Sequence, residues 1–333
     1  MTSNGCAAEG LRLQQGADGS FSLFSERFGE GFHGPIGALR EARAKFVQPA
    51  ELQRFAPGQQ LVVVDVGFGL GTNSAALLEA AQQLGLGLRI EGLEIDPEPV
   101  RQALAAEGFR RQWRPSTVEA LNELLACGRA TVPAPGHPGA ASTMQLHWGD
   151  ARQRVADLQE QGQLAGGCDL VLLDAFSPQR CPELWSLEFL GALAQLLRPE
   201  GRLLTYCCAA AVRRALQLVG LELASVQPPP GARPDPAIPD APMPGRAWSY
   251  GTVASPSSLV SGHGGDGPLL PLSPMELDHL NTRAAEPYRD PGGQACAAAI
   301  LAARQRMQAC SAAESTSAWR RRWGLDADNS RHT

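Results

Sequence analysis

The chain of 333 residues is long enough for about two domains, or for one large domain with additions. With 44% hydrophobic and 19% charged residues, its composition is that of a soluble globular protein, which excludes a disordered chain, a coiled coil and a small disulfide scaffold. The net charge of −5 gives no sign of a nucleic-acid partner, and no apolar run approaches the ~20 residues of a membrane span.

The first residues, MTSNGCAAEG, contain neither a cationic start nor an apolar stretch, so we expect a cytoplasmic protein without membrane association. Eight cysteines include no CxxC pair and no Cys/His pair at zinc spacing. We therefore expect reduced thiols and no metal site.

Between residues 61 and 221 apolar segments alternate with helical ones, which is typical of a parallel sheet covered by helices. The pattern predicts an α/β, doubly wound, Rossmann-like sheet. The expected strands are 61–67, 88–96, 143–150, 168–176 and 202–208, and the expected helices are 72–85, 97–107, 182–197 and 210–220.

We divide the chain into an N-terminal extension or cap (1–60), the α/β domain (61–255), a linker (256–272) and a helical C-terminal tail (273–333). Within the domain, 130–142 is expected to be a surface insertion, 228–244 an irregular stretch with eight prolines, and 248–255 an edge strand. The tail opens on a capping-box pattern, Ser273-Pro274-Met275-Glu276. From residue 283 onward it carries eight arginines against five acids.

A glycine-rich motif lies where the strand 61–67 turns into the helix 72–85. Its glycines permit a tight turn and bring backbone N–H groups close to a ligand at a helix N-terminus. Thr72 stands where a dinucleotide fingerprint has its third glycine, and no Gly-Lys-Ser/Thr occurs, so neither that fingerprint nor a P-loop is present. The pattern resembles the first motif of class I S-adenosylmethionine-dependent methyltransferases, which implies that cofactor. The motif residues expected to bind it are Asp65, Gly67, Phe68, Gly69, Gly71 and Asn73.

Further acids stand at the ends of the following strands. Glu94 is expected to accept hydrogen bonds from ribose hydroxyls, and Asp150 from the exocyclic amine of adenine. Asp174 ends the fourth strand, faces the same crevice and is also expected to bind the cofactor. A solvated strand-end acid remains the alternative for Glu94, and a loop-capping role the alternative for Asp174.

The segment 174–185, DAFSPQRCPELW, resembles the D-A-F-x-P-x-x-x-P-x-x-W stretch of the MnmC-type tRNA wobble-uridine methyltransferases. The resemblance extends to EARAKF (41–46), to the glycine loop and to LLTYCCAAAVRR (203–214), and covers roughly 21–255; RAAEPYRDP (283–291) looks like a tail of stand-alone members. It implies methylation of the amine of 5-aminomethyl-(2-thio)uridine at the tRNA wobble position, with Glu41 among the cofactor-binding residues.

The chain departs from the two-domain form of this family in two ways. No second dinucleotide fingerprint follows, so we expect no FAD and no oxidase half, and another route must supply the aminomethyl group. A basic glycine-rich ending is replaced by the proline-rich stretch.

Methyl transfer requires a neutral amine aligned with the sulfonium, and a carboxylate can orient that amine and accept its proton. Asp174 is our candidate catalytic residue. Phe176 and Trp185 are candidates for stacking on a base, with Pro178 beside them, although Trp185 also fits a helix core.

Arginines are the candidates for phosphate contacts, although runs of arginine are often merely solvated. For His33 we expect a loop-packing role. The arginine candidates are Arg213, Arg214, Arg304, Arg306 and Arg320 to Arg322.

Two other functions remain open. One is N-methyl or aminopropyl transfer to a small amine. The other is a non-catalytic RNA-binding protein that keeps a methyltransferase scaffold. The oligomeric state is not predicted.

Overall fold

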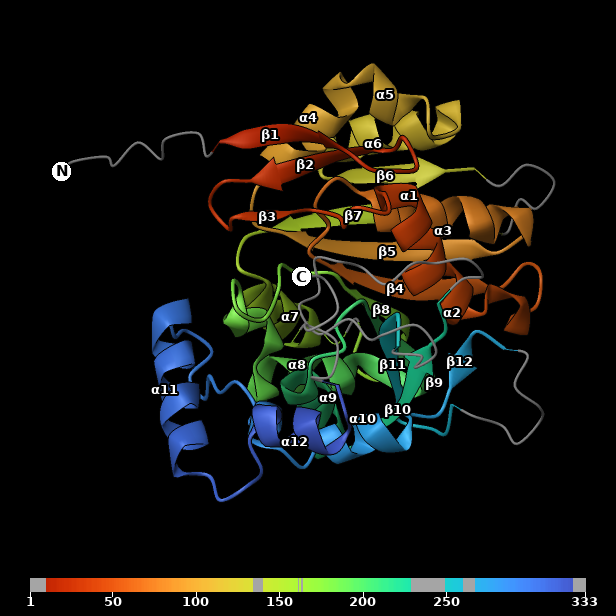
Figure 1. Cartoon of the computed structure of the whole chain (residues 1–333). Coiled ribbons are helices and arrows are strands. Elements are labelled where there is room, and N and C mark those ends of the chain that lie inside the picture. Colours follow the sequence, from red (N-terminus) through yellow and green to blue (C-terminus); the bar gives the residue numbers. More distant parts are fainter. Residues whose placement is uncertain are drawn as a thin grey trace.

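The computed structural model describes residues 10–133, 140–160, 162, 164–228, 249–259 and 267–325. At its centre is a nine-stranded sheet with the order β12-β10-β11-β9-β8-β4-β5-β7-β6 (Figure 1). Its strands are β4 (Gln60–Val66), β5 (Gly87–Glu94), β6 (Arg129–Val132), β7 (Ser142–Trp148), β8 (Cys168–Leu173), β9 (Leu197–Thr205), β10 (Glu222–Val226), β11 (Gly251–Ser255) and β12 (Leu269–Leu270).

The five central strands, β7, β5, β4, β8 and β9, are parallel to one another. β4, the first of them in the chain, pairs with β5 on one side and β8 on the other, so the strand order reverses there. In sheets of this kind a ligand binds at the carboxyl ends of the strands at the reversal. The topology therefore directs attention to the loops that follow β4, β5 and β8.

Helices cover both faces of the sheet, which confirms the doubly wound α/β prediction. α3 and α6 pack on one face through Leu77 and Leu121, and α7, α8 and α9 pack on the other through residues such as Leu193. The helices are α3 (Thr72–Gln83), α4 (Glu98–Ala105), α5 (Glu107–Arg110), α6 (Pro115–Cys127), α7 (Ala151–Glu160), α8 (Leu187–Leu196) and α9 (Ala210–Leu218).

Three local predictions are wrong. Within the expected insertion, β6 pairs antiparallel with β7. The expected edge strand, β11, lies inside the sheet between β9 and β10 and is fully buried. The single expected helix 182–197 is divided into η4 (Pro182–Trp185) and α8, because the Ser186 side chain caps α8 by accepting from the Phe189 amide. The parts of the two irregular stretches at 134–139 and 229–244 lie outside the described residues.

The N-terminal extension forms a small antiparallel sheet and a series of short helices. Ala42 and Phe46 of η1 join the same core as α3. The elements are β1 (Leu11–Gln15), β2 (Phe21–Ser25), β3 (Glu30–Gly31), α1 (Ala38–Glu41), the π-helix η1 (Ala42–Val47), α2 (Gln48–Ala50) and η2 (Leu52–Arg54).

The C-terminal tail is helical, and its blue helices lie beside α8 and α9 in Figure 1. It consists of α10 (Pro274–His279), η5 (Arg283–Ala285), α11 (Ala297–Cys310) and α12 (Thr316–Arg322). The predicted capping box of Ser273 and Glu276 is present. Tyr288 and Ile300 enter the core on the α8 and α9 side of the sheet. The division into domains stays a prediction.

A buried ion pair joins the tail to α9. The Arg213 guanidinium, 1% exposed, donates to Glu276 Oε1 at 2.8 Å and to Thr252 Oγ1 at 2.9 Å. The prediction that Arg213 contacts phosphate is therefore wrong, because its charge is enclosed and already paired. Arg214, its neighbour, is exposed.

Among the described residues, no helix combines the length and the apolar character required to cross a membrane.

Arg213→Met should lower the free energy of unfolding by about 3 to 5 kcal/mol, because Glu276 would remain buried without its cation. Arg214→Met, one residue along the same helix, should change it by less than about 0.5 kcal/mol. Although burial opposes ionisation, Arg213 lowers the pKa of Glu276 to about 2. The stabilisation should therefore be lost as the pH falls from about 4.3 towards 2. Urea unfolding of both variants tests this, and equal effects would contradict it.

Candidate active site

The glycine loop between β4 and α3 depends on left-handed backbone conformations. Gly67, Gly69 and Gly71 have φ of 79°, 56° and 81°. A Cβ on Gly67 would lie 2.9 Å from the carbonyl oxygen of Asp174, so the loop packs directly on the backbone that follows β8. The amides of Gly67 and Phe68 both donate to the Leu93 carbonyl at 3.1 Å. The loop is thus fixed between the ends of β5 and β8.

The Phe68 ring lies under the loop and not in a ligand site. It is 3% exposed, and a Cβ on Gly71 or Gly92 would come within 2.9 or 2.8 Å of it. Any contribution of Phe68 to cofactor binding therefore comes from its backbone.

Glu94 is held against the loop from β5. Its Oε2 accepts from the Gly69 amide at 2.7 Å, and its Oε1 accepts from the amides of Ile95 and Asp96 at 2.7 and 3.0 Å. Burial raises the pKa of this carboxyl. Because a carboxylate offers about four lone-pair sites, Glu94 can accept a further hydrogen bond from a ligand hydroxyl.

Asp174 lies on the other side of the loop, and its Oδ2 accepts from Asn73 Nδ2 at 2.6 Å. Burial raises the pKa of Asp174 to about 7; the Asn73 hydrogen bond opposes the shift and the charge of Glu41 adds to it. Asp174 therefore changes its charge near neutral pH, as a general base or acid does.

Asp65, near the end of β4, joins that strand to the first turn of α3. It is 1% exposed, and its Oδ2 accepts from Ser74 Oγ at 2.6 Å. Its Oδ1 and the hydroxyl of Thr72 have no hydrogen-bond partner in the structure. Burial raises the pKa of Asp65 to about 7. Its location favours an indirect role in cofactor binding.

A buried ion pair from the N-terminal extension adjoins Asp174. Lys45 Nζ donates to Glu41 Oε1 at 2.6 Å and lies 4.8 Å from the ring centroid of Tyr250 and 5.8 Å from that of Tyr206. Although burial disfavours the ammonium, Glu41 keeps the pKa of Lys45 above its usual value, and Asp174 adds to the effect. Glu41 Oε2 accepts from the Gly34 amide at 2.8 Å, so both oxygens of this predicted cofactor residue have protein partners.

Sequence reasoning named no role for Lys45, Tyr206 or Tyr250. A signal existed, since Lys45 is the only lysine and these are two of only three tyrosines. His33 lies in the same region, where Ser22 Oγ is 2.9 Å from its Nδ1. Burial lowers the pKa of His33 to about 4, which suits a neutral packing role.

Aromatic rings gather around Phe176. The Phe28 ring stacks on it with centroids 4.2 Å apart, and the Phe32 ring meets it edge-on at 5.1 Å. All three rings are partly exposed. Phe28 and Phe32 come from the extension and were not predicted.

Trp185 and Pro178, unlike the three phenylalanine rings, are not accessible for stacking on a base. Trp185 is fully buried, and its Nε1 donates to the Phe176 carbonyl at 2.8 Å. The prediction that a base stacks on Trp185 is therefore wrong, because its ring is enclosed in the core beside Tyr206. Pro178 is buried as well.

The arginine candidates have different environments. Arg304 donates to the carbonyls of Ala284 and Glu286, and Arg322 pairs with Asp278 and Glu314. Arg214, Arg306 and Arg321 are exposed, and Arg320 is partly exposed.

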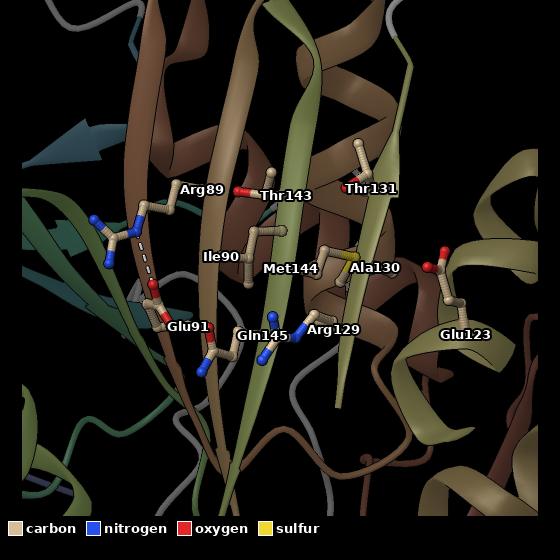
Figure 2. Close-up of a pocket in the computed structure, with 10 residues that line it drawn as sticks. All are labelled: Arg89, Ile90, Glu91, Glu123, Arg129, Ala130, Thr131, Thr143, Met144 and Gln145. Atoms are coloured by element: carbon tan, nitrogen blue, oxygen red, sulfur yellow. Dashed lines mark hydrogen bonds and ion pairs between the residues drawn. The ribbon is translucent and has the colours of Figure 1, made fainter. Parts of the chain in front are cut away.

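A separate cavity of about 260 Å³ lies along β5, β6 and β7 (Figure 2). None of the predicted site residues lines it. Its lining residues are Arg89, Ile90, Glu91, Glu123, Arg129, Ala130, Thr131, Thr143, Met144 and Gln145. Within the described ranges, no group of three or more His, Cys, Asp or Glu side chains is placed to hold a metal ion.

Comparisons with known proteins point to a methyltransferase. A family model described as S-adenosyl-L-methionine-dependent methyltransferase matches residues 136–234. The "tRNA 5-methylaminomethyl-2-thiouridine biosynthesis bifunctional protein MnmC" of Cupriavidus necator is 31% identical over 218 residues, which cover 60% of this chain and 30% of that protein. Its counterpart in Caulobacter vibrioides is 32% identical over 209 residues, covering 60% and 33%. The chain thus spans about a third of the length of these curated relatives.

The solved structure of MNMC2 from Aquifex aeolicus matches with a TM-score of 0.66 and 25% identity, over 91% of this chain and 87% of that one. These similarities confirm the resemblance to MnmC-type methyltransferases and the class I methyltransferase fold. The description of the matched family agrees with the predicted cofactor, S-adenosylmethionine.

Gly67→Ala should abolish tight binding of S-adenosylhomocysteine and destabilise the fold by roughly 1 to 3 kcal/mol, because the new Cβ would push the loop away from Asp174. Gly58→Ala is a matched control, since Gly58 has φ of 86° but open space around its Cβ. Gly58→Ala introduces a comparable backbone strain without a steric clash, so this variant should bind S-adenosylhomocysteine as tightly as the wild type. Calorimetric titration measures both, and equal losses of affinity would contradict the close-packing argument.

Proposed function

We propose that this chain transfers a methyl group from S-adenosylmethionine to the amine of 5-aminomethyl-(2-thio)uridine at the wobble position of tRNA. The observation that carries the proposal is Asp174, a partly buried carboxyl hydrogen-bonded to Asn73 beside the glycine loop. The named activity of the MnmC relatives supports the choice of substrate. A cytoplasmic location follows from tRNA as the proposed partner.

The residues at the strand ends fit the cofactor. The glycine loop brings backbone at the α3 N-terminus close to its methionine portion, with the unpartnered Thr72 hydroxyl nearby. Glu94 accepts from the ribose hydroxyls and Asp150 from the adenine amine. When bound, S-adenosylmethionine supplies an electrophilic methyl group on a sulfonium. Transfer of that group to an amine requires neither FAD nor a metal.

Asp174 orients the acceptor amine and takes up its proton. A free alkylamine has a pKa of about 10.4 and is mostly protonated at pH 7, whereas only the neutral form attacks. The carboxylate of Asp174 favours the ammonium form of an amine nearby, and its raised pKa limits this effect. Lys45 adds no net positive charge, because it is paired with Glu41 at 2.6 Å.

Phe176, Phe28 and Phe32 form the proposed contact with the uridine base, because aromatic rings stack on bases in single-stranded RNA. Arg27 lies over the Phe28 ring at 5.1 Å and Arg180 is 54% exposed beside Gly29. These arginines, together with Arg214, are the candidates for phosphate contacts.

The function is tested by incubating the full chain with S-adenosylmethionine carrying a labelled methyl group and with tRNA bearing 5-aminomethyl-2-thiouridine. Mass spectrometry of the digested tRNA should find the label in the methylaminomethyl nucleoside. An unlabelled nucleoside pool, or transfer to small amines alone, would contradict the proposed substrate.

Asp174→Asn should lower kcat by roughly 10²- to 10⁴-fold while binding of S-adenosylhomocysteine changes little. Since the ionised form acts as the base and its pKa is about 7, wild-type kcat/KM should fall as the pH drops below 7. In Asp174→Asn, kcat/KM should no longer show the fall that comes from protonation of Asp174. Full activity of Asp174→Asn, or an unchanged pH profile, would rule out the catalytic role.

A further inference from the structure

The C-terminal segment 288–295 reaches back to the end of β7, where Asp150 lies between that strand and α7. Tyr288 forms an isolated parallel β-bridge with Ser186, and its carbonyl accepts from the Leu187 amide at 2.9 Å. Its hydroxyl is 3.2 Å from Gln179 Nε2, in the loop that follows Asp174. The segment therefore contacts the connection from β8 to α8 at the carboxyl edge of the sheet.

Arg152 holds Asp150 by a forked interaction. Its Nη2 donates to Asp150 Oδ2 at 2.6 Å, its Nε donates to Oδ1 at 3.1 Å, and its backbone amide donates to Oδ1 at 2.9 Å. Such a fork fixes the plane of a carboxylate as well as its position. Burial opposes ionisation of Asp150, but Arg152 keeps its pKa below the usual value. Asp150 is thus an ionised acceptor at neutral pH.

Asp290 holds Arg152 in turn. The Arg152 Nη1 donates to Asp290 Oδ2 at 2.7 Å and to the Ala295 carbonyl at 3.0 Å. Asp290 is 1% exposed; its Oδ1 accepts from the amides of Gln294 and Ala295, and its own amide donates to Glu188 at 2.7 Å. Both oxygens of the Asp290 carboxylate therefore accept hydrogen bonds, and the Arg152 guanidinium is held between Asp150, Asp290 and the Ala295 carbonyl.

We propose that Asp290, acting through Arg152, is a positioning residue that makes the site selective for a 6-aminopurine. The inference rests on the proposed function, which assigns Asp150 to the adenine amine. An ionised carboxylate in a fixed plane accepts a hydrogen bond from an exocyclic amine and repels the carbonyl oxygen that replaces it in a 6-oxopurine. Without Asp290, the Arg152 side chain and the Asp150 carboxylate rotate, and the distinction between the two purines weakens.

The test compares the binding of S-adenosylhomocysteine and of its 6-oxo analogue, S-inosylhomocysteine, to the full chain by calorimetric titration. A hydrogen bond to a charged group discriminates by about 10-fold or more, so the wild type should prefer the adenosyl ligand by that factor. Asp290→Asn keeps the size and one acceptor oxygen but presents an amide to Arg152. Its preference should fall to about 3-fold or less, mainly through weaker binding of the adenosyl ligand.

Two further variants distinguish an effect of the Asp290–Arg152–Asp150 contacts from a general effect of the tail. Arg152→Lys keeps the charge without the fork and should lose the preference as well. Glu314→Gln removes a carboxylate that pairs with Arg322 elsewhere in the tail, and it should keep the wild-type preference. A merely structural role of the tail would weaken both ligands by the same factor.

The outcomes separate the two proposals. Loss of the preference in Asp290→Asn and Arg152→Lys, but not in Glu314→Gln, supports the positioning role. A wild-type preference that survives both substitutions overturns it while the proposed function stands. A wild type that binds neither ligand overturns the proposed function, and the positioning role with it.

Discussion

The close approach of Gly67 to the backbone of Asp174 is the constraint on which the candidate site depends. A Cβ would lie 2.9 Å from the Asp174 carbonyl oxygen, so only glycine allows β4 to turn into α3 at this point. The turn places Asn73 within 2.6 Å of Asp174 and the Gly69 amide within 2.7 Å of Glu94. One backbone contact thus brings together side chains from three neighbouring strand ends, and the other parts of the site are built around it.

Charge is the second organising feature. Asp65 is buried, and Glu94 and Asp174 are partly buried, at one edge of the sheet, where removal from water raises the pKa of each. The Glu41–Lys45 pair brings a buried ammonium into this acidic region. This balance suits a site that receives a sulfonium cofactor and an amine. After β7, the Arg152 guanidinium provides the positive charge between two carboxylates, Asp150 and Asp290 of the tail.

The central fold and the loop were predictable from the sequence because they depend on local patterns. Buried strands such as 61–67 are continuous apolar runs, and the glycines follow directly. The position of β11 inside the sheet was not predictable, since pairing with β9 and β10 depends on contacts distant in sequence. For the same reason Arg213 was mistaken for a surface residue, because its partner Glu276 lies 63 positions downstream. Phe28 and Phe32 come to the site from a part of the extension in which no motif is recognised. Lys45 lies in the segment 41–46, but the resemblance of that segment implied a role for Glu41 only.

The most direct measurement of the central claim is a crystal structure of the full chain with S-adenosylhomocysteine. The account predicts that the ribose hydroxyls donate to Glu94, that the adenine amine donates to Asp150, and that the sulfur faces Asp174 across the glycine loop. A ligand bound elsewhere, for example in the cavity along β5, β6 and β7, or a sulfur directed away from Asp174, would contradict it.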